Sequence, residues 1–529
     1  MPIQPPVPAP RPLLEAYRAG DLADLFPRRP GDLEGALAMP RDVDRQALVA
    51  ALRPGAERWG ARPAQREALE RLAHPDSRVV VTGQQVGWLL GPTYTLSKAV
   101  TAVRLARDLD RSERPVVPVF WMATQDHDVA EIDHAWVLGR DERVHRLHLP
   151  LRPGPAVGRA ALDPAWIEAA AGHLRAIDLA DDRGGPHLED VVALLLEAAD
   201  GAARWSDAFA RLLSRLLGDE GLLLLDPLDQ EVARLWRPQL ERELDAPEVS
   251  ADHIRQGATR LEARGFAAQL GRAEGATNLF VERPRGLARE LLRRDSDGWR
   301  IGHGRVRQEE LRAWLDEDPT AVTPAAGLRP VLQDAVLPSA VFVAGPGELR
   351  YLAQLRGVYE QHGVPMPLVW PRVSATVLQP PVRRILERHG LDWRVVQRDP
   401  WHAHCELALR LHGHADAFAV ALATVEGGTD RLLSEVDAID PTLERSVRKG
   451  RRHLERTLVT LREKTASALA RRDDQLRRQF GRLEAHLRPN GGLQERVLSP
   501  FTFFLTLGVE PVRDAFLTLP PEGDHALTF

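Results

Sequence analysis

Short apolar runs alternate with helical patterns in the middle of the chain. The run SRVVVTG at 77–83 ends in a glycine, a helical pattern follows in YTLSKAVTAVRLARDLD at 94–110, and a second apolar run begins at Val116. Strand, glycine-bearing turn, helix and strand in this order are typical of a βαβ unit with parallel strands. The pattern therefore predicts an α/β fold with a parallel sheet.

The same pattern returns further along the chain. GLLLLDPLD at 221–229 is an apolar run closed by acidic residues, PSAVFVAGPGELRYLAQLRGVY is again strand, turn and helix, and PLVWPRVSATVL closes the core. Mixed segments at about 135–219 and about 265–327 interrupt it, and the second predicts a meander of short antiparallel strands. We predict a core over 76–379 that carries these two insertions.

Helical patterns flank this core. LLEAYRAGDLADLF and PAQREALERLA place apolar residues at helical spacing, which predicts a helical layer over 1–75. The stretches 404–425 and 441–487 predict two long helices separated by GGTDRLLSEVDAIDP, as an antiparallel helical coiled coil within 380–487. The last segment, 488–529, is predicted to dock on the core.

Composition narrows the class of protein. The 529 residues carry a formal net charge of -5, and no apolar stretch approaches the ~20 residues of a membrane span. The N-terminus MPIQPPVPAPRP lacks the basic start and apolar core of a signal peptide. We therefore predict a soluble, cytoplasmic protein with no membrane partner. The single cysteine, Cys405, excludes an intramolecular disulfide and is interpreted as an ordinary packed thiol.

One stretch of the chain is strongly basic. Between Leu443 and Glu484, 13 Lys+Arg stand against 6 Asp+Glu, a local charge of +7 (13 − 6). Such a stretch could contact nucleic acid. A solvated face of the coiled coil is the favoured interpretation, so we expect no nucleic-acid partner.

The first group of candidate site residues follows the first apolar run, in TGQQVGWLLGPTYTLSKA. Glycines after a strand let the backbone approach a ligand, and the next helix begins with unpaired amides that attract anions. Lys98, one of only three lysines among 70 Lys+Arg, supplies a compact positive charge. The candidates are Thr82, Gly83, Gln84, Gln85, Gly91, Tyr94, Thr95 and Lys98. A purely structural turn from strand to helix explains the pattern equally well.

The second group lies in WMATQDHDVAEIDH. Asp126, His127 and Asp128 follow an apolar strand, at the edge where open α/β sheets bind ligands. If a helix follows, His127, Glu131 and His134 lie on one stripe. Acid-base catalysis or substrate binding by His127 is the favoured interpretation. A helix capped by aspartates comes second, and a divalent metal site is the least favoured.

The third group lies in FVAGPGELRYLAQL and WPRVSAT. Glu348 begins a helix after a glycine turn, where it could also simply complement the helix dipole. Arg329 and the arginine of WPRVSAT are candidates for binding a carboxylate, or else surface ion pairs. If the strands are parallel, all three groups meet at one edge of the sheet. The candidate substrate-binding residues of this group are Gly345, Gly347, Glu348, Tyr351, Arg372 and Ser374.

Six blocks of sequence carry a resemblance to a known family. They are TGQQVGWLLGPTYTLSKA, PVFWMATQDHDVAEIDH, GATNLF, FVAGPGELRYLAQL, PRVSAT and PNGGLQER, in order along the whole chain. In this combination the chain resembles the bacillithiol synthase family. Its members are the cysteine ligases to which the joining of cysteine to glucosaminyl malate is assigned. The resemblance implies a Rossmann-like core with inserted connecting subdomains, similar to pantothenate synthetase and class I aminoacyl-tRNA synthetases. It also implies a coiled coil that mediates homodimerisation.

The resemblance implies a reaction as well, formation of an amide bond between the carboxyl of cysteine and the amine of glucosaminyl malate. A carboxylate does not condense unaided with an amine in water, so an activated acyl donor is needed. ATP is the obvious source of activation, and ATP or ADP is the expected cofactor. GPTYTLSK occupies the place of the H-x-G-H signature of the synthetases, but both histidines are absent between Gly91 and Tyr94, which departs from a standard adenylate mechanism.

The candidate residues can be given roles in this reaction. Lys98 is expected to neutralise a phosphate or carboxylate. Asp126, His127 and Asp128 are expected to hold the amine, with His127 accepting its proton as the bond forms. Glu348 is expected to position an ammonium group.

Asn490, in PNGGLQER, is expected to contribute to a nucleotide pocket, although a simple turn asparagine is equally consistent with the sequence. Two other functions compete with the ligase. One is a metal-dependent hydrolase that uses His127, Glu131 and His134, whereas the ligase is expected to hold no metal. The other is a nucleic-acid-binding protein with a basic coiled-coil arm.

Overall fold

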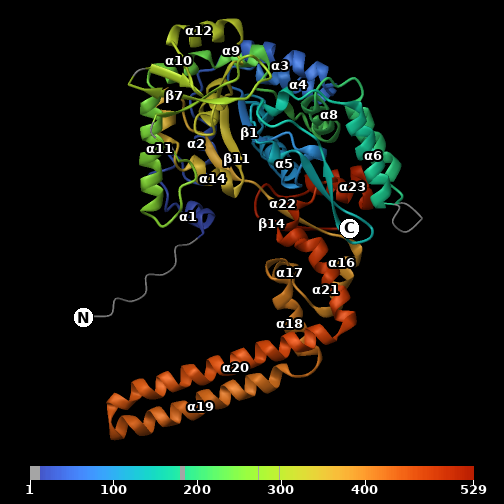
Figure 1. Cartoon of the computed structure of the whole chain (residues 1–529), viewed down its shortest axis with the longest axis vertical. Helices are drawn as coiled ribbons and strands as arrows, with labels where there is room; N and C mark the ends of the chain where they lie inside the picture. The colour runs from blue at the N-terminus through green and yellow to red at the C-terminus, as the bar shows by residue number, and fades with distance from the viewer. Residues whose placement is uncertain (1–11, 179–184, 272, 274, 297) are drawn as a thin grey trace. The chain divides into compact units, whose positions relative to one another are not determined.

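The computed structural model describes residues 12–178, 185–271, 273, 275–296 and 298–529 (Figure 1). Residues 1–11 of the predicted N-terminal layer, and residues 179–184, 272, 274 and 297 of the predicted insertions, lie outside the described residues. The described chain forms two units. The first holds 12–140, 145–375 and 498–527, and the second holds 141–144, 376–497 and 528–529.

A five-stranded parallel sheet forms the centre of the first unit (Figure 1). Every neighbouring pair of strands is parallel. The strands lie in the order β12 (Leu368–Pro371), β11 (Ser339–Ala344), β1 (Arg78–Gln84), β2 (Val116–Met122) and β5 (Leu223–Leu225). Nearly continuous apolar runs are typical of strands buried on both faces. The predicted parallel α/β core is confirmed.

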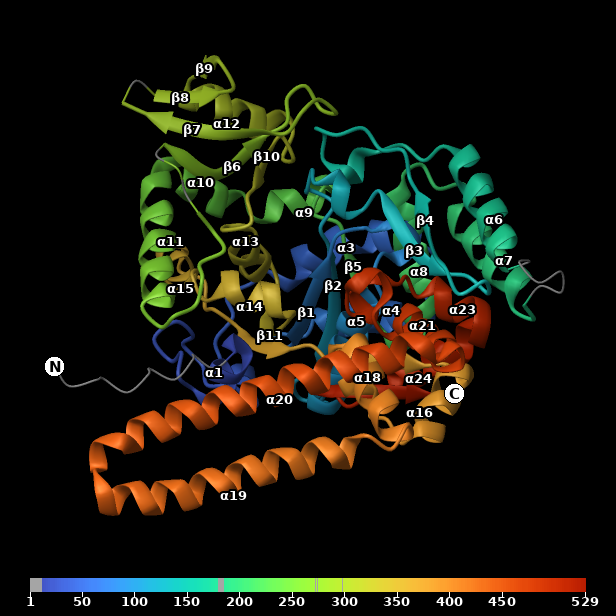
Figure 2. The same ribbon diagram turned by 60° about the horizontal axis from the view of Figure 1, so that its bottom comes forward.

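Alternate side chains of these strands enter two separate cores. Val79 and Val81 of β1 pack with Trp121 on one face of the sheet, whereas Val80 packs on the other with Val341 and with helix α5 (Tyr94–Leu109). Successive side chains of a strand point to opposite faces, so both faces of the sheet are covered. Helix α5 connects β1 to β2, as Figure 2 shows.

The remaining helices of the first unit surround this sheet or belong to the segments inserted between its strands. Before β1 lie α1 (Leu13–Ala19), α2 (Leu33–Leu37), α3 (Arg45–Arg58) and α4 (Pro63–Leu72). Between β2 and β11 lie α6 (Pro164–Asp178), α7 (Leu188–Ala199), α8 (Trp205–Leu217), α9 (Gln230–Leu235), α10 (Arg237–Asp245), α11 (Pro247–Glu262), α12 (Gln308–Glu317) and α13 (Arg329–Val336). After β11 lie α14 (Pro346–Leu352), α15 (Arg356–His362), α23 (Phe501–Leu507) and α24 (Val509–Leu517).

A second sheet of five strands lies within the same unit, and Figure 2 shows it apart from the parallel sheet. Its strands are antiparallel, in the order β10 (Val322–Pro324), β6 (Ala276–Val281), β7 (Glu290–Asp295), β8 (Gly298–Ile301) and β9 (Gly304–Val306). The predicted antiparallel meander is confirmed. A smaller two-stranded sheet holds β3 (His134–Leu138) and β4 (Val144–His148).

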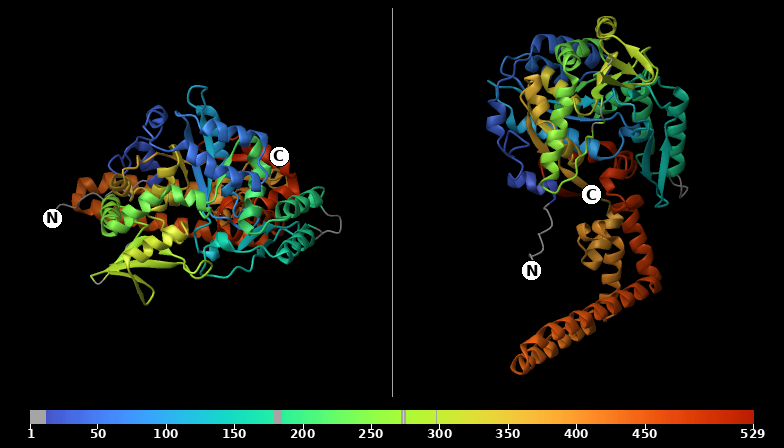
Figure 3. Two further views of the ribbon diagram at one scale, coloured as in Figure 1. Left: turned by 90° about the horizontal axis from the view of Figure 1, so that it is seen from above. Right: turned by 60° about the vertical axis from the view of Figure 1, so that its left-hand side comes forward.

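The second unit is helical over most of its length. Its short helices are α16 (Pro380–His389), α17 (Trp393–Arg398), α18 (Pro400–Leu411), α21 (Asp474–Leu487) and α22 (Gln494–Val497). Two long helices, α19 (Ala415–Ile439) and α20 (Glu444–Arg472), lie side by side in Figures 1, 2 and 3, and Arg451 of α20 pairs with Asp430 of α19 at 2.8 Å. A long antiparallel helical pair is confirmed, and its expected role in dimerisation stays a prediction.

The positions of the helix ends differ from the prediction. Helix α19 runs through Gly427 and Gly428, so the predicted break at GGTDR is wrong, and the chain turns instead at Asp440. A glycine in a helix costs about 1 kcal/mol, which the pairing of two long helices outweighs. The predicted first helix, 404–425, is divided at Gly413, whose φ of 74° ends α18. The predicted second helix, 441–487, is divided at Asp473, whose carboxylate caps α21 by accepting from the Leu476 amide.

No helix among the described residues is both long enough and apolar enough to cross a membrane.

Two further strands of the described chain are β13 (Ser374–Leu378) and β14 (Asp524–Thr528).

Candidate active site at the carboxyl edge of the parallel sheet

The candidate residues follow the carboxyl ends of neighbouring strands. Strand β1 leads to Gln85, β2 to Asp126, β11 to Gly345 and β12 to Arg372. Because these strands are parallel, their carboxyl ends lie along one edge of the sheet, where open α/β sheets bind ligands. The structure thus brings the three predicted groups to a common edge.

Lys98 joins two of these strand ends. It projects from α5, is only 3% exposed, and donates to the Gly83 carbonyl at 2.8 Å and to Gln84 Oε1 at 3.0 Å. Its ammonium also pairs with the carboxylate of Glu348. An ammonium has three N–H groups, so these three acceptors use all of them. A ligand phosphate would have to displace one acceptor to reach Lys98.

Glu348 is held by groups from three directions. Its Oε2 accepts from the Gly345 amide at 2.8 Å, so Glu348 caps α14 while it pairs with Lys98. The Tyr351 hydroxyl lies 3.5 Å from Oε1 and itself accepts from Arg329 at 2.8 Å. Arg329, Tyr351, Glu348 and Lys98 therefore form one chain of contacts.

Arg372 and Tyr94 extend this cluster. The guanidinium of Arg372 lies 5.4 Å from the centre of the Tyr94 ring, and Gln84 Nε2 donates to the Tyr94 hydroxyl at 3.1 Å. A Cβ at Gly345 would lie 3.7 Å from Arg372 Nε and 3.8 Å from Lys98 Cε. Both cations therefore lie close to the backbone of the β11–α14 turn.

The charged groups of this cluster include both cations and carboxylates. Lys98, Arg329 and Arg372 are its cations, and Glu348 is the carboxylate that pairs with Lys98. The charges of Glu131 and Asp126 also act on Lys98 and Arg329. Burial lowers the pKa of Lys98, and the neighbouring carboxylate of Glu348 opposes that shift. Burial raises the pKa of Tyr351, so its phenol is neutral at physiological pH. Three cations thus lie in the cluster, with carboxylates beside them.

Asp126 is the centre of the second cluster. Its Oδ2 accepts from Gln85 Nε2 at 2.7 Å, and its Oδ1 accepts from the amides of His127 at 2.7 Å and Asp128 at 3.3 Å. Burial alone would raise the pKa of Asp126, but the Gln85 hydrogen bond, the charge of Arg289 and the two amides together lower it. Asp126 is therefore a carboxylate at neutral pH.

His127 is held by an arginine that was not among the predicted site residues. Arg289 Nη1 lies 3.0 Å from His127 Nδ1, while Arg289 also donates to Thr323 Oγ1 at 2.8 Å and to the Pro324 carbonyl at 2.6 Å. Its guanidinium carbon lies 4.0 Å from the centre of the Phe280 ring. Burial lowers the pKa of Arg289 to about 10, so it remains a cation at neutral pH. No local motif marks Arg289, which lies in an arginine-rich stretch, GLARELLRR.

Two adjacent glutamines connect the clusters. Gln84, the last residue of β1, contacts Lys98 and Tyr94, whereas Gln85 contacts Asp126. Because neighbouring residues of an extended chain point in opposite directions, one glutamine can serve each cluster. Lys98 and Glu348 are thus connected to Asp126, which accepts from the His127 amide, through two residues joined by a peptide bond.

Buried polar groups without a partner lie on the same segments. The Thr95 hydroxyl and both side-chain amide atoms of Gln125 are buried, and no hydrogen-bond partner lies within reach among the described residues. Such groups are rare in proteins and are usually satisfied by water or a ligand. Thr95 lies in the first turn of α5, and its Oγ1 is 3.9 Å from the position of a Cβ at Gly91.

The turn between β1 and α5 needs glycine at a defined place. Gly91 has φ 64° and ψ −152°, a region open almost only to glycine. The preceding Leu89 and Leu90 also have positive φ, 47° and 68°. Ser499 Oγ donates to the Leu89 carbonyl at 2.8 Å, which helps to hold this turn in place.

Several predicted residues have other contacts. The Thr82 hydroxyl donates to the Val343 carbonyl at 3.0 Å and so joins β1 to β11. The Asp128 carboxylate accepts from the Ala130 amide at 3.1 Å and caps a single 3-10 turn, Val129–Glu131. The Ser374 amide donates to the Gly523 carbonyl at 2.9 Å. The roles predicted for these residues, and for Gly347, stay predictions. Asn490 belongs to the second unit, in a turn where its φ is 49°, and its nucleotide contact also stays a prediction.

The helical stripe proposed for a metal is wrong. Only Val129–Glu131 is helical, as a 3-10 turn, and His134 is the first residue of β3, where its Nδ1 lies 2.7 Å from Asp133 Oδ1. Residues 134–137 alternate between half-buried and buried positions, as the side chains of a strand do. Within the part of the chain that the structure describes, no three His, Cys, Asp or Glu side chains are arranged to hold a metal ion.

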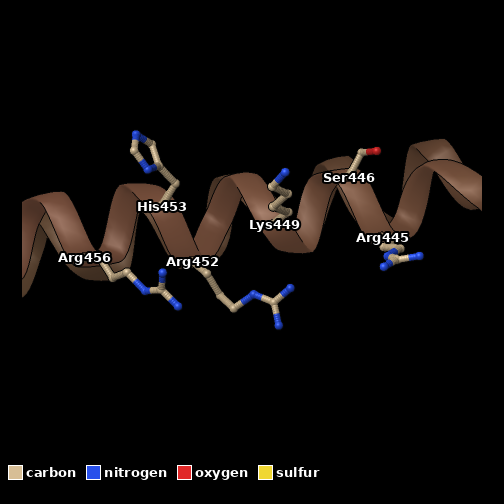
Figure 4. Close-up of a pocket in the computed structure, with 6 residues that line it drawn as sticks. All are labelled: Arg445, Ser446, Lys449, Arg452, His453 and Arg456. Carbon is tan, nitrogen blue, oxygen red and sulfur yellow. The ribbon is translucent and has the colours of Figure 1, made fainter. Parts of the chain in front are cut away.

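A separate concentration of positive charge lies on α20. A pocket there is lined by six residues of this helix, which Figure 4 labels: Arg445, Ser446, Lys449, Arg452, His453 and Arg456. The four cations occupy positions i, i+4, i+7 and i+11, which fall on one face of a helix. None of the four makes an ion pair with another described residue, whereas the neighbouring Arg448 and Arg451 do.

Comparisons with known proteins agree over both units. A family model described as "Bacillithiol biosynthesis BshC, N-terminal Rossmann-like domain" matches residues 21–373. A second, described as "Bacillithiol biosynthesis BshC, C-terminal coiled-coil domain", matches residues 375–527. Among solved structures, an arginyl-tRNA synthetase from Thermus thermophilus shares 13% identity with a TM-score of 0.17, covering 82% of this chain and 85% of that one.

Curated relatives carry the name "Putative cysteine ligase BshC". A protein of this name from Thermus thermophilus is 41% identical over 467 residues, which cover 87% of this chain and 89% of the relative. The Salinibacter ruber protein is 35% identical, covering 90% and 88%, and the Geobacillus kaustophilus protein is 31% identical, covering 97% and 94%. With both family models and near-complete coverage of its relatives, the chain belongs to the bacillithiol biosynthesis BshC family.

Proposed function

We propose that the chain is a cysteine ligase that forms an amide bond between the carboxyl of cysteine and the amine of glucosaminyl malate. The observation that carries the proposal is that two successive residues, Gln84 and Gln85, contact Lys98 and Asp126, at the edge of a Rossmann-like sheet where open α/β sheets bind ligands. The printed name of the relatives and the resemblance of the sequence blocks support the same reaction.

The two clusters suit the two kinds of substrate group. The cluster of Lys98, Arg329 and Arg372 contains three cations, the kind of group that binds a carboxylate or phosphate. The ionised carboxylate of Asp126 fits an amine or ammonium. Bond formation requires the amine nitrogen to attack an activated acyl carbon, the leaving group to depart with its electron pair, and the amine to lose a proton.

We propose ATP as the source of acyl activation. Its phosphates fit the first cluster, since the buried Thr95 hydroxyl at the start of α5 has no partner among the described residues and three cations lie in that cluster. The donors of Lys98 are already committed, so a phosphate that reached Lys98 would have to displace one of its acceptors. When bound, ATP would supply the leaving group that a free carboxylate lacks.

The proposal is tested by product formation. The purified chain is incubated with cysteine, glucosaminyl malate and ATP, and the products are analysed by mass spectrometry for the amide and by chromatography for cleaved nucleotide. We expect the amide only when all three are present. Amide formed without ATP would contradict the proposed activation, and absence of the amide under every condition would contradict the ligase itself.

Asp126→Asn is expected to lower the rate of amide formation about 10- to 100-fold, because a neutral amide holds an amine less strongly than a carboxylate does. The matched control is Asp200→Asn, at an exposed aspartate of the same unit, which should retain the parent rate. Equal rates in both variants would remove Asp126 from the site.

A second candidate function, nucleic-acid binding, is favoured by four cations of α20, Arg445, Lys449, Arg452 and Arg456, which make no ion pair among the described residues. If they bind phosphates, affinity for a labelled 20-nucleotide RNA should fall about 10²-fold between 50 and 200 mM salt. Arg452→Gln combined with Arg456→Gln should lower the affinity for RNA below that of the parent chain at the same salt concentration. Arg448→Gln, at an arginine already paired with Glu444, should not. Fluorescence anisotropy measures both effects, and affinity independent of these charges would reject this candidate.

A further inference from the structure

The contact between Arg289 and His127 fixes which nitrogen of the imidazole carries a proton. Arginine has N–H donors and no acceptor, so the 3.0 Å contact between Arg289 Nη1 and His127 Nδ1 requires an unprotonated Nδ1 with its lone pair directed at the guanidinium. An Nδ1–H would place two donors against each other. The neutral imidazole must then carry its proton on Nε2.

Arg289 is not free to turn away from this contact. It is 7% exposed, and its other nitrogens donate to Thr323 Oγ1 at 2.8 Å and to the Pro324 carbonyl at 2.6 Å. Its guanidinium carbon lies 4.0 Å from the centre of the Phe280 ring, and the His127 ring lies 5.2 Å from the same ring. Residues of the second sheet thus hold the Arg289 guanidinium in place against the imidazole.

The charged groups near His127 shift its pKa in opposite directions. Burial and the charge of Arg289 lower the pKa of His127, and the carboxylates of Asp126 and Asp128 oppose that shift without reversing it. His127 Nδ1 lies 3.8 Å from Asp126 Oδ1, which is longer than its contact with Arg289. The imidazole is therefore neutral at physiological pH. Its side chain is 39% exposed, and Arg289 is its hydrogen-bond partner among the described residues.

We propose that Arg289 is a positioning residue that holds His127 as the neutral Nε2–H tautomer, so that His127 donates a hydrogen bond to an electron-rich oxygen of the substrate and does not accept the amine proton. This inference rests on the proposed ligase function. In amide formation, the carbonyl oxygen of the acyl donor gains negative charge as the amine attacks. A fixed donor at that oxygen stabilises the charge, as a neutral imidazole can. Nε2–H has no lone pair for the amine proton, which passes to another acceptor or to water.

Two substitutions of His127 distinguish a donor from a base. Glutamine can donate a hydrogen bond from its side-chain amide but cannot take up a proton, whereas alanine can do neither. We expect His127→Ala to lower the rate of amide formation about 10²-fold and His127→Gln to retain a rate within about tenfold of the parent. Equal loss in both variants would overturn the donor role.

The tautomer can be measured without any assay of activity. In a two-bond ¹⁵N–¹H spectrum of the whole chain labelled with [¹⁵N]histidine, the His127 signals are assigned by their loss in His127→Gln. We expect the Nε2–H pattern at pH 7, and protonation of His127 at a lower pH than the value of about 6.5 at which an ordinary histidine titrates. An Nδ1–H pattern or an imidazolium at pH 7 would overturn the proposal.

Substitution of Arg289 tests its part directly. Arg289→Met removes the donor and the charge, so the His127 signals should shift to a mixture of tautomers and titrate near pH 6.5. Arg285→Met, at an arginine of the same loop that pairs with Asp318 and is 49% exposed, is the matched control and should leave the pattern unchanged. If Arg289→Met fails to fold, the parent spectrum and the two His127 variants still decide the question. If the parent chain makes no amide, the ligase proposal fails while the spectrum still reports the tautomer.

Discussion

Lys98→Met and Glu348→Gln are each expected to destabilise the first unit by about 3–5 kcal/mol, because each leaves a buried charge without its partner. The side chains of Lys98 and Glu348 are 4% and 14% exposed, so water cannot replace the lost contact. Each variant should also lower amide formation by at least about tenfold, since the pair joins the turns after β1 and β11 that form the site. Urea unfolding followed by tryptophan fluorescence measures the stability, and the mass assay measures the rate.

The double variant Lys98→Met/Glu348→Gln separates stability from function. It removes both charges, so it should regain part of the stability that each single variant loses. The rate of amide formation should not recover, because the positive charge at the site is still missing. A double variant as unstable as the sum of the two singles would mean that Lys98 and Glu348 do not act as a pair.

Arg107→Gln provides the matched control on the same helix. Arg107 also forms an ion pair from α5, with Glu220, but its side chain is 51% exposed. Exposed ion pairs contribute about 0–1 kcal/mol, so this variant should unfold at nearly the urea concentration of the parent. If Lys98→Met shifted the midpoint no more than Arg107→Gln, the buried ion pair would not exist in solution.

The parallel core could be predicted because its signal is local. The apolar runs of β1, β2 and β11 are each followed by glycine or polar residues, and this order specifies strand, turn and helix without reference to distant segments. Parallel strands bring their carboxyl ends together, so the shared edge of Gln85, Asp126 and Glu348 also followed from the sequence. The contacts between those residues did not, because each depends on the rotamers of side chains from different strands.

The site residue that the sequence did not reveal contacts a residue far from it along the chain. Arg289 contacts His127 across 162 positions of the chain, and nothing in its own segment distinguishes it from neighbouring arginines. The role that the sequence predicts for His127 differs from the proposed donor role for the same reason. The sequence around His127 suggests a base flanked by carboxylates, whereas a guanidinium from another sheet occupies the nitrogen that would face them.

In the helical unit, too, local sequence was not enough to predict the structure. Gly427 and Gly428 are poor helix formers, so local propensity predicts a break there. In the structure, α19 passes through both glycines, and ion pairs such as Arg451 with Asp430 join it to α20. Tertiary pairing with α20, the next long helix of the chain, therefore outweighs helix propensity at these positions.

The second unit is expected to lose about 2 kcal/mol of stability between pH 7 and pH 5 from His486 alone. His486 is 6% exposed, and burial together with the charge of Arg482 lowers its pKa to about 4. In the unfolded chain the ordinary value is about 6.5. The unfolded state therefore binds a proton first as the pH falls, so this contribution is complete above about pH 6.5 and is lost progressively down to about pH 4.

His486→Leu removes the titrating group and should flatten this pH dependence. Thermal unfolding at pH 7 and pH 5, followed by circular dichroism, is compared for the parent, His486→Leu and the control His453→Gln, which replaces an exposed histidine of the same unit. The fall in melting temperature between the two pH values should be smaller in His486→Leu than in the parent, and the same as the parent in His453→Gln. Because the buried Nδ1 of His486 has no partner among the described residues, leucine should not destabilise the unit at pH 7 through a lost hydrogen bond at that atom. An unchanged fall in His486→Leu would show that His486 is already protonated, and so reached by water, in the folded chain at pH 5.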